Sequence, residues 1–247
     1  MIIKNKEQNR IKFVLIILAR MNSRRYPKKS VCQIAGLPLI SYILNRLVPW
    51  SSINNFDIFV AIEDLSTDYQ IAEIAKSYRV YCLDGNGQSP KDRIGRILRD
   101  NDYDYFFRIN GDSPFVDIEL LQIAIDKIIE DPSNAPDFVT NLKPRTYPYG
   151  VSVELCKSSL FINAIDNGTL KDDENVFDHI YQDSNSLNIA SIILEEDINL
   201  SKMRLVIDEP EDSSKINSIL NRFEISERRL ITWKRICDSI GYDDLLP

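Results

Sequence analysis

A tight cluster of cations follows the first apolar run of the chain, residues 13–19. Its members are Arg20, Arg24, Arg25, Lys28 and Lys29. Because like charges repel one another, the cluster is more easily understood if a polyanion such as a triphosphate sits among them. The alternative is a solvated charged loop, which most charge runs form. We favour the first interpretation, so the cluster predicts an anion-binding loop.

Two aspartates lie in similar surroundings further along the chain. Asp112 in RINGDSP and Asp208 in RLVIDEP each follow an apolar run, and a proline follows each within two residues. The chain must turn there, so both carboxylates are expected in the crevice at the strand ends. Mg²⁺ takes one or two protein carboxylates and completes its shell with phosphates and water. The alternative is that each aspartate caps the next helix; together with the cationic loop, the pair favours a metal site.

Alternating apolar runs and amphipathic segments predict how these residues are positioned. Strands are expected over residues 13–19, 56–63, 80–85 and 103–114. Helices are expected from Pro38, Ser66, Pro90 and Ile118. This alternation predicts an α/β fold, a three-layer α/β/α sandwich with a mostly parallel, Rossmann-like sheet. Ligands bind such sheets at the carboxyl ends of the strands, which is where the cationic loop emerges.

The pattern is less regular beyond residue 137. Short strands are expected at residues 137–141, 151–156 and 187–194, and a helix is expected at 159–168. An acidic segment covers residues 171–183, and an apolar run that ends in an acid covers residues 203–208. Two amphipathic helices are expected over residues 213–241. No linker marks a boundary, so we expect a single domain over 1–247, with a small sugar-side or dimerisation excursion around 141–190.

Composition excludes several classes of protein. With 247 residues and 44% hydrophobic content, the chain can bury a sizeable core. Its net charge of -7 argues against general nucleic-acid binding, which needs a broad basic face. Because the basic cluster is local, the expected anion is small.

The apolar run at residues 13–19 is too short to cross a membrane. Arginines also follow it where a signal peptide would have small cleavage-site residues, so a buried first strand is expected. The cysteines are scattered and form no Cys-x-x-Cys pair, which indicates neither disulfides nor zinc and favours a reduced cytoplasmic protein. The single histidine, His179, has apolar neighbours and is interpreted as structural.

Four motifs together resemble a known family. ARMNSRRYPKK, with the following IAGLPLISYILNRL, resembles the opening signature of the sugar-activating cytidylyltransferases, which include the CMP-KDO and CMP-sialic acid synthetases. RINGDSPFVD, NLKPRTYPYGVSVE and RLVIDEPED are similar to the SpsF-type branch of that group. The resemblance spans residues 13–220 in the family's order. The chain departs from the pattern at Asn22, where glycine is usual, and at 173–176, where Arg-Glu-His-Val is usual.

The resemblance implies a GT-A-like nucleotide-diphospho-sugar transferase fold and a CTP-dependent enzyme that releases pyrophosphate and forms a CMP-linked sugar acid. It also implies Mg²⁺ as cofactor, a homodimer and a role in surface polysaccharide synthesis. The residues that match the nucleotide-binding positions are Arg20, Ser23, Arg25, Lys29 and Arg93. Those that match the catalytic positions are Arg25, Lys29, Asp112 and Asp208, the last two as metal ligands. Those in the block that lines the sugar side are Asn141, Arg145, Tyr147 and Glu154.

Other functions remain open on the same fold. A GT-A glycosyltransferase would use a metal-binding Asp-x-Asp, but the nearest candidate, Asp102 to Asp104, precedes the fourth strand and does not end it. A nucleotidyltransferase with a non-sugar acceptor is a further alternative. A catalytically silent nucleotide-binding paralogue would keep the fold and lose the acids, yet both acids and all the loop cations are present. We therefore favour a reaction in which a sugar hydroxyl attacks the α-phosphorus of CTP in line with departing pyrophosphate.

Overall fold

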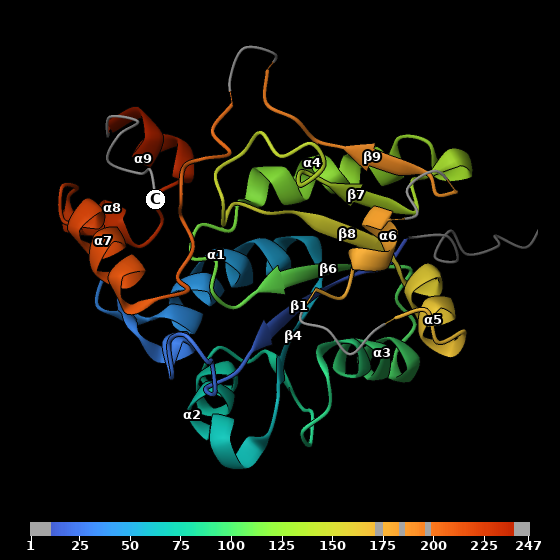
Figure 1. Ribbon diagram of the computed structural model, residues 1–247, viewed down its shortest axis with the longest axis horizontal. Coiled ribbons are helices and arrows are strands. Elements are labelled where there is room, and N and C mark those ends of the chain that lie inside the picture. Colours follow the sequence, from blue (N-terminus) through green and yellow to red (C-terminus); the bar gives the residue numbers. More distant parts are fainter. Residues whose placement is uncertain (1–10, 171–174, 183–185, 196–198, 240–247) are drawn as a thin grey trace, which may run out of the picture.

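A seven-stranded sheet enclosed by helices forms the centre of the protein (Figure 1). The computed structural model describes residues 11–170, 175–182, 186–195 and 199–239. The strands of the sheet, in their order across it, are β5 (Tyr81–Asp84), β4 (Asp57–Ile62), β1 (Phe13–Ala19), β6 (Tyr105–Asn110), β8 (Glu154–Lys157), β7 (Phe138–Thr140) and β9 (Ile189–Ser191). A separate antiparallel pair consists of β2 (Gln33–Ile34) and β3 (Leu37–Pro38).

The sheet is mostly parallel, with one strand reversed. β1 pairs in parallel with β4 and β6, and β4 pairs in parallel with β5. β8 runs antiparallel to both β6 and β7, while β7 and β9 are parallel. The carboxyl ends of β1, β4 and β6 therefore meet at one edge of the sheet, and this edge carries the site.

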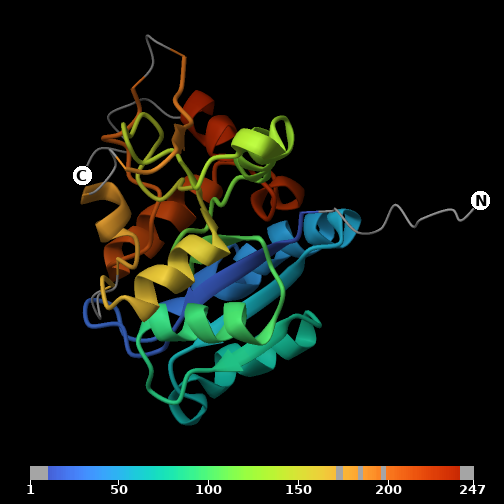
Figure 2. The same cartoon turned by 90° about the vertical axis from the view of Figure 1, so that its right-hand side faces the viewer.

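Helices cover both faces, which confirms the three-layer α/β/α prediction. One face packs against α1 (Leu39–Asn54), α2 (Leu65–Ser77), α4 (Ile118–Ile129), α7 (Pro210–Leu220) and α9 (Trp233–Ser239). The other packs against α3 (Pro90–Asp100), α5 (Ser158–Asp166) and α6 (Asp178–Gln182). Figure 2 shows α3 (green) and α5 (yellow) in front of β1 (blue). The remaining short helices are α8 (Ile225–Arg228) and the 3₁₀ turns η1 (Lys29–Val31) and η2 (Pro132–Asn134).

Strand β1 shows why its sequence is a continuous apolar run. Leu15 and Ile17 lie in the core on the α1 face, and Val14 and Ile16 lie in the core on the α3 face. All four are fully buried. A strand covered on both faces cannot alternate apolar and polar residues, so its sequence has the pattern of a parallel sheet's interior.

Two parts of the second half differ from the expected elements. The run leading to Asp208 is not a strand of the sheet, since it makes only an isolated bridge between Tyr149 and Arg204. The strand expected at 151–156 begins only at Glu154, and the expected tail of two helices consists of α7, α8 and α9. Alternating apolar residues report which side chains are buried, and a loop packed on the core can show that pattern without a partner strand.

The region 141–190 contributes β8, α5, α6 and the start of β9 to the same fold. Part of its acidic segment, at 171–174 and 183, lies outside the described residues. In the described parts of the chain, no helix combines the length and the apolar character needed to span a membrane.

Candidate active site

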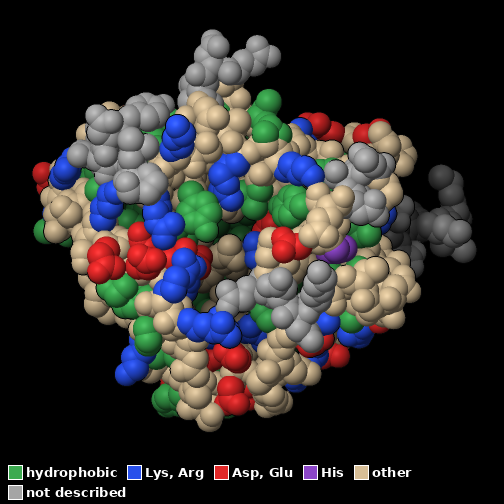
Figure 3. Space-filling view, viewed as in Figure 1, with side chains coloured by type: hydrophobic (Ala, Val, Ile, Leu, Met, Phe, Trp, Pro, Cys, Tyr) green, Lys and Arg blue, Asp and Glu red, His purple; other side chains and the backbone are tan. Residues whose placement is uncertain are grey.

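A cavity of about 870 Å³ lies beyond the carboxyl ends of β1 and β6. It is lined by Ser23, Arg24, Arg25, Lys29, Arg108, Asn110, Asp112, Ser113, Leu142, Arg145, Tyr149, Gly150, Ser152, Asn175, Tyr181, Val206 and Asp208. Figure 3 shows a hollow near the middle of this face, with Lys and Arg side chains along its margins and acidic side chains gathered on one side. The position agrees with the rule that open α/β sheets bind ligands at their strand ends.

Lys29 joins the two predicted metal aspartates. Its Nζ lies 2.7 Å from Oδ2 of Asp112 and 3.2 Å from Oδ1 of Asp208. The two carboxylates come from loops that are far apart in the sequence, and they converge on one ammonium group. Burial works against the charge of Lys29, but the two carboxylates more than offset it and raise its pKa. The ammonium group of Lys29 therefore brings the cationic loop together with Asp112 and Asp208.

Neither aspartate is needed as a helix cap. The N-cap of α4 is Asp117, whose carboxylate accepts hydrogen bonds from the amides of Glu119 and Leu120 at 2.8 and 3.2 Å. Helix α7 begins with a capping box formed by Glu209 and Asp212. Because other residues satisfy both helix starts, the capping alternative does not explain Asp112 or Asp208.

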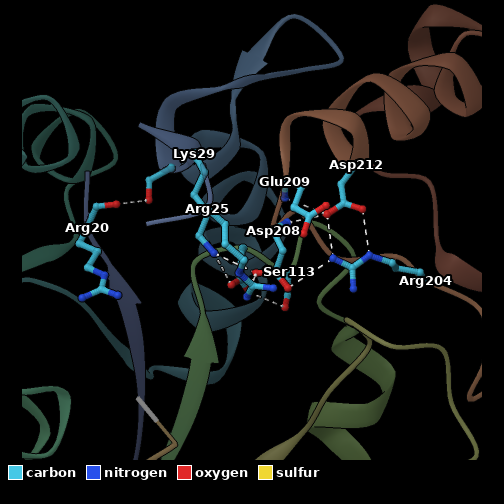
Figure 4. A network of polar contacts seen from close by, with 10 residues as sticks. Arg20, Arg25, Lys29, Ser113, Arg204, Asp208, Glu209 and Asp212 are labelled. Carbon is cyan, nitrogen blue, oxygen red and sulfur yellow. Dashed lines mark hydrogen bonds and ion pairs between the residues drawn. The ribbon is translucent and has the colours of Figure 1, made fainter. Parts of the chain in front are cut away.

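Asp208 is held from several directions. Arg25 lies 3.2 Å from its Oδ1, and Arg204 lies 3.4 Å from its Oδ2. Arg204 is in turn fixed by two 2.9 Å contacts with the carboxylate of Asp212, which raise its pKa. Figure 4 shows Arg25 and Lys29 approaching Asp208 from one side and Arg204 from the other.

The loop leading to Asp208 is anchored although it is outside the sheet. The amide of Ile207 donates to the carbonyl of Asp112 at 2.9 Å, and the amide of Leu205 donates to the carbonyl of Tyr149 at 2.7 Å. Gly150 permits this approach, because a Cβ there would lie 2.6 Å from the backbone of Leu205 and its φ is +101°. The backbone thus holds the two acidic loops side by side.

Arg20 and Arg93 lie at a smaller cavity of about 100 Å³ that shares Lys29, Asn110 and Asp112 with the large one. Arg93 is 3% exposed and donates from Nη1 to the carbonyl of Ala61 at 2.7 Å. Its Nε is buried and has no hydrogen-bond partner among the described residues. Arg20 points away from the cluster around Asp208 (Figure 4) and lies 3.7 Å from Glu63.

Arg145 and Arg204 both lie close to the ring of Tyr149, which lines the large cavity. The two guanidinium carbons are 5.1 and 5.4 Å from the centre of its ring. Burial lowers the pKa of Arg145. Its Nη1 is buried with no hydrogen-bond partner in the described parts of the chain. Arg145 also lines the large cavity, so its positive charge is available to an anion there.

Glu154 contacts residues that line the cavity but does not line it itself. It is 2% exposed and accepts from Nε of Arg108 at 2.8 Å and from the hydroxyl of Tyr181 at 2.7 Å. Burial is the main cause of a strongly raised pKa for Tyr181, which keeps its hydroxyl protonated. Arg108 and Tyr181 both line the cavity, so Glu154 orients two cavity-lining groups without lining it.

Asn141 and Tyr147 belong to the framework of the fold. Asn141 is fully buried and exchanges hydrogen bonds with the backbone of Val151 and Val153, at 2.9 and 2.8 Å. The ring of Tyr147 packs edge-on against Trp233, with centroids 5.5 Å apart. Neither residue lines the large cavity. Of the four residues assigned to the sugar side, the structure brings only Arg145 to the cavity and Glu154 close to it.

Several cavity residues were not predicted from the sequence. Arg108, Tyr149 and Tyr181 line the cavity, and Arg204 contacts Asp208. The sequence does hold a signal for Arg108, a charge inside the apolar strand YFFRIN, and for Arg204, a charge beside the apolar run before Asp208. His179 lies on α6 and does not line this cavity.

The mostly parallel α/β sheet with helices on both faces matches the fold of solved nucleotide-diphospho-sugar transferases. The family model for cytidylyltransferases matches residues 14–233. The chain therefore belongs to the CTP-dependent cytidylyltransferase family.

Individual relatives agree with this assignment. The chain is 27% identical to the spore coat polysaccharide biosynthesis protein SpsF of Bacillus subtilis, over 89% of this chain and 92% of that protein. A cytidylyltransferase structure from Leptospira borgpetersenii superposes with a TM-score of 0.85 at 22% identity, covering 96% of this chain and 98% of that one. A CMP-2-keto-3-deoxy-manno-octonic acid synthetase solved with CTP superposes with a TM-score of 0.62 at 14% identity, covering 85% and 99%. The last two likenesses concern the fold.

Proposed function

We propose that this protein transfers CMP from CTP to a hydroxyl group of a sugar acid and releases pyrophosphate. The observation that carries the proposal is the convergence of Lys29 on Asp112 and Asp208, at 2.7 and 3.2 Å, inside the cationic cavity. The acceptor oxygen would form a bond to the α-phosphorus as the bond to the pyrophosphate oxygen breaks. The acceptor's proton goes to solvent.

The two cavities suggest how CTP lies. The smaller cavity, with Arg20 and Arg93, would hold the cytidine, and the boundary it shares with the large cavity would hold the phosphates. Ser23, Arg25 and Lys29 from the cationic loop would contact the triphosphate. Fixed cations close to the leaving oxygens stabilise charge that grows in the transition state, which is commonly the largest contribution of such sites.

Asp112 and Asp208 suit Mg²⁺. Carboxylate oxygens are ligands that Mg²⁺ prefers, and two of them leave the remaining positions for phosphates and water. The convergence of these acids on one ammonium group supports their sharing a single cation. When bound, Mg²⁺ would supply positive charge to the phosphate oxygens. We propose Asp112 and Asp208 as its protein ligands.

The part of the cavity lined by Arg145 supports a sugar acid as acceptor. The guanidinium group of Arg145 is a cation that suits a carboxylate. Arg108 and Tyr181, oriented by Glu154, offer polar groups for sugar hydroxyls. The similarity to SpsF supports a role in surface polysaccharide synthesis. We further propose that the enzyme acts in the cytoplasm as a homodimer.

A glycosyltransferase is less well supported. The carboxylates of an Asp-x-Asp would have to face the cavity, but Asp102 is paired with Nζ of Lys12 at 2.7 Å, and Asp104 accepts the Lys12 amide at 2.8 Å. Both aspartates precede β6, at the end of the strand opposite Asp112. They are therefore poorly placed to hold a metal beside the nucleotide.

The base preference can be tested by thermal shift. A ligand that binds only the folded state stabilises it by mass action, by about 2.7 kcal/mol at a hundred times its Kd. CTP with Mg²⁺ is expected to raise the Tm more than UTP, GTP or ATP at the same concentration. A larger shift with another nucleotide would contradict the proposed donor.

Replacing Arg145 by Met is expected to raise the KM for the acceptor about 10- to 100-fold, because a hydrogen bond to a charged group contributes about 1.5–3 kcal/mol. The KM for CTP should change little, since Arg145 does not line the smaller cavity that is proposed to hold the cytidine. The measurement is pyrophosphate release with a panel of ulosonic acids and neutral sugars. Arg145→Lys should restore part of the loss, and Arg99→Met, which removes a surface partner of Asp166, is the control. An unchanged KM of Arg145→Met for the ulosonic acids would refute an anion-binding role.

A further inference from the structure

Asp68 is a buried carboxylate that contacts two of the loops at the site edge of the sheet. It lies in the first turn of α2 and is 1% exposed. Its Oδ1 accepts a hydrogen bond at 2.7 Å from the amide of Met21, near the start of the cationic loop that follows β1. Its Oδ2 accepts from the amides of Glu63 and Asp64, at 2.8 and 3.2 Å, directly after β4. One side chain thus connects the loops that follow β1 and β4.

Met21 is the residue on which the cationic loop closes. Its carbonyl accepts from the amide of Lys28 at 2.7 Å and from the amide of Ser23 at 3.0 Å. The next residue after Lys28 is Lys29, which reaches Asp112 and Asp208. The amide of Met21 is therefore the point through which Asp68 can set the position of the whole loop.

Helix α2 does not depend on Asp68 for its cap. The N-cap is Asp64, whose side chain accepts from the amide of Ser66 at 2.7 Å. Glu63, whose amide donates to Asp68, also places its carboxylate 3.7 Å from the guanidinium group of Arg20, which belongs to the cationic loop. A fully buried carboxylate is costly unless it is well hydrogen-bonded, and here the backbone amides of the two loops meet that need.

We infer that Asp68 is a positioning residue, which holds the cationic loop in register with Asp112 and Asp208 through the amide of Met21. The inference rests on the proposed role of this loop in binding the triphosphate. Without Asp68 the Met21 amide is left unpaired and the loop can shift. The loss then falls mainly on the binding of CTP, since Asp68 itself touches neither cavity.

The test compares Asp68→Ala with Asp64→Ala, which removes the cap of the same helix and leaves the Met21 contact intact. Asp68→Ala is expected to raise the KM for CTP about 10- to 100-fold, with a smaller change in kcat. Asp68→Asn keeps one carbonyl oxygen and should recover part of the loss. It also serves as the working variant if Asp68→Ala does not fold. Asp64→Ala should lower the Tm and leave the KM for CTP near that of wild type.

Limited trypsin digestion gives a second readout that does not depend on CTP. The loop offers cleavage sites at Arg24, Arg25, Lys28 and Lys29. Faster cleavage there in Asp68→Ala or Asp68→Asn, and not in Asp64→Ala, supports the inference. Equal cleavage rates in the Asp68 variants and wild type would overturn it. Failure of wild type to bind CTP would instead overturn the proposed function, while the digestion still decides the role of Asp68.

Discussion

Replacing either Asp112 or Asp208 by Asn is expected to lower kcat for pyrophosphate release by at least about a hundredfold, the usual order of loss when preorganised electrostatic stabilisation is removed. Asn has nearly the same shape as Asp and no negative charge. Each substitution therefore leaves Lys29 facing one carboxylate where the wild type has two. The same change weakens the proposed Mg²⁺ site, because it removes one of two anionic ligands.

The assay for these variants uses CTP, Mg²⁺ and a panel of ulosonic acids. Asp166→Asn is a matched control, because Asp166 loses the same charge in a surface pair with Arg99, on α5 and away from the cavity. Binding of Mn²⁺ to the CTP-loaded protein provides a readout besides turnover. Wild-type turnover in both variants would eliminate the metal assignment. Wild-type protein that binds CTP without turnover would indicate the catalytically silent paralogue.

The second large effect is expected at Lys29, which has two roles in the structure. Its ammonium group separates Asp112 from Asp208 and is also the deepest cation of the loop proposed to hold the triphosphate, with a side chain that is 15% exposed. Lys29→Met is expected to lower kcat/KM for CTP about a hundredfold or more. The free protein should lose on the order of 2 kcal/mol of stability, less than a fully broken buried pair, because Asp208 keeps Arg25 and Arg204.

Divalent cations distinguish the two roles of Lys29. In Lys29→Met the two aspartates face each other without the ammonium between them, so Mg²⁺ or Mn²⁺ without nucleotide should raise the Tm more than in wild type. Lys76→Met, which changes an exposed lysine on α2, is the control and should respond as wild type does. An equal response of Lys29→Met and wild type to the cation would show that Asp112 and Asp208 do not share a metal.

Much of the fold follows from short-range patterns. β1 begins and ends at the expected residues and α3 begins at the expected Pro90, since a strand buried on both faces and a helix led by Ser89 and Pro90 are each marked locally. The alternation of these elements was sufficient to predict a mostly parallel sheet. β8 could not be predicted as an antiparallel insertion between β6 and β7, because alternation in a sequence does not identify the partner strands.

The candidate site shows the same division. The sequence by itself determined that a cationic loop would follow the first strand and that Asp112 and Asp208 would lie at turns, because charge clusters, apolar runs and prolines act locally. Only the tertiary structure decided that the two aspartates meet at Lys29, that Asn141 and Tyr147 are used inside the framework, and that Arg108 and Tyr181 reach the cavity. The physical reason is that a polar side chain can serve equally as a cap, a framework bond or a ligand contact. Which role it takes depends on groups brought close by distant parts of the chain.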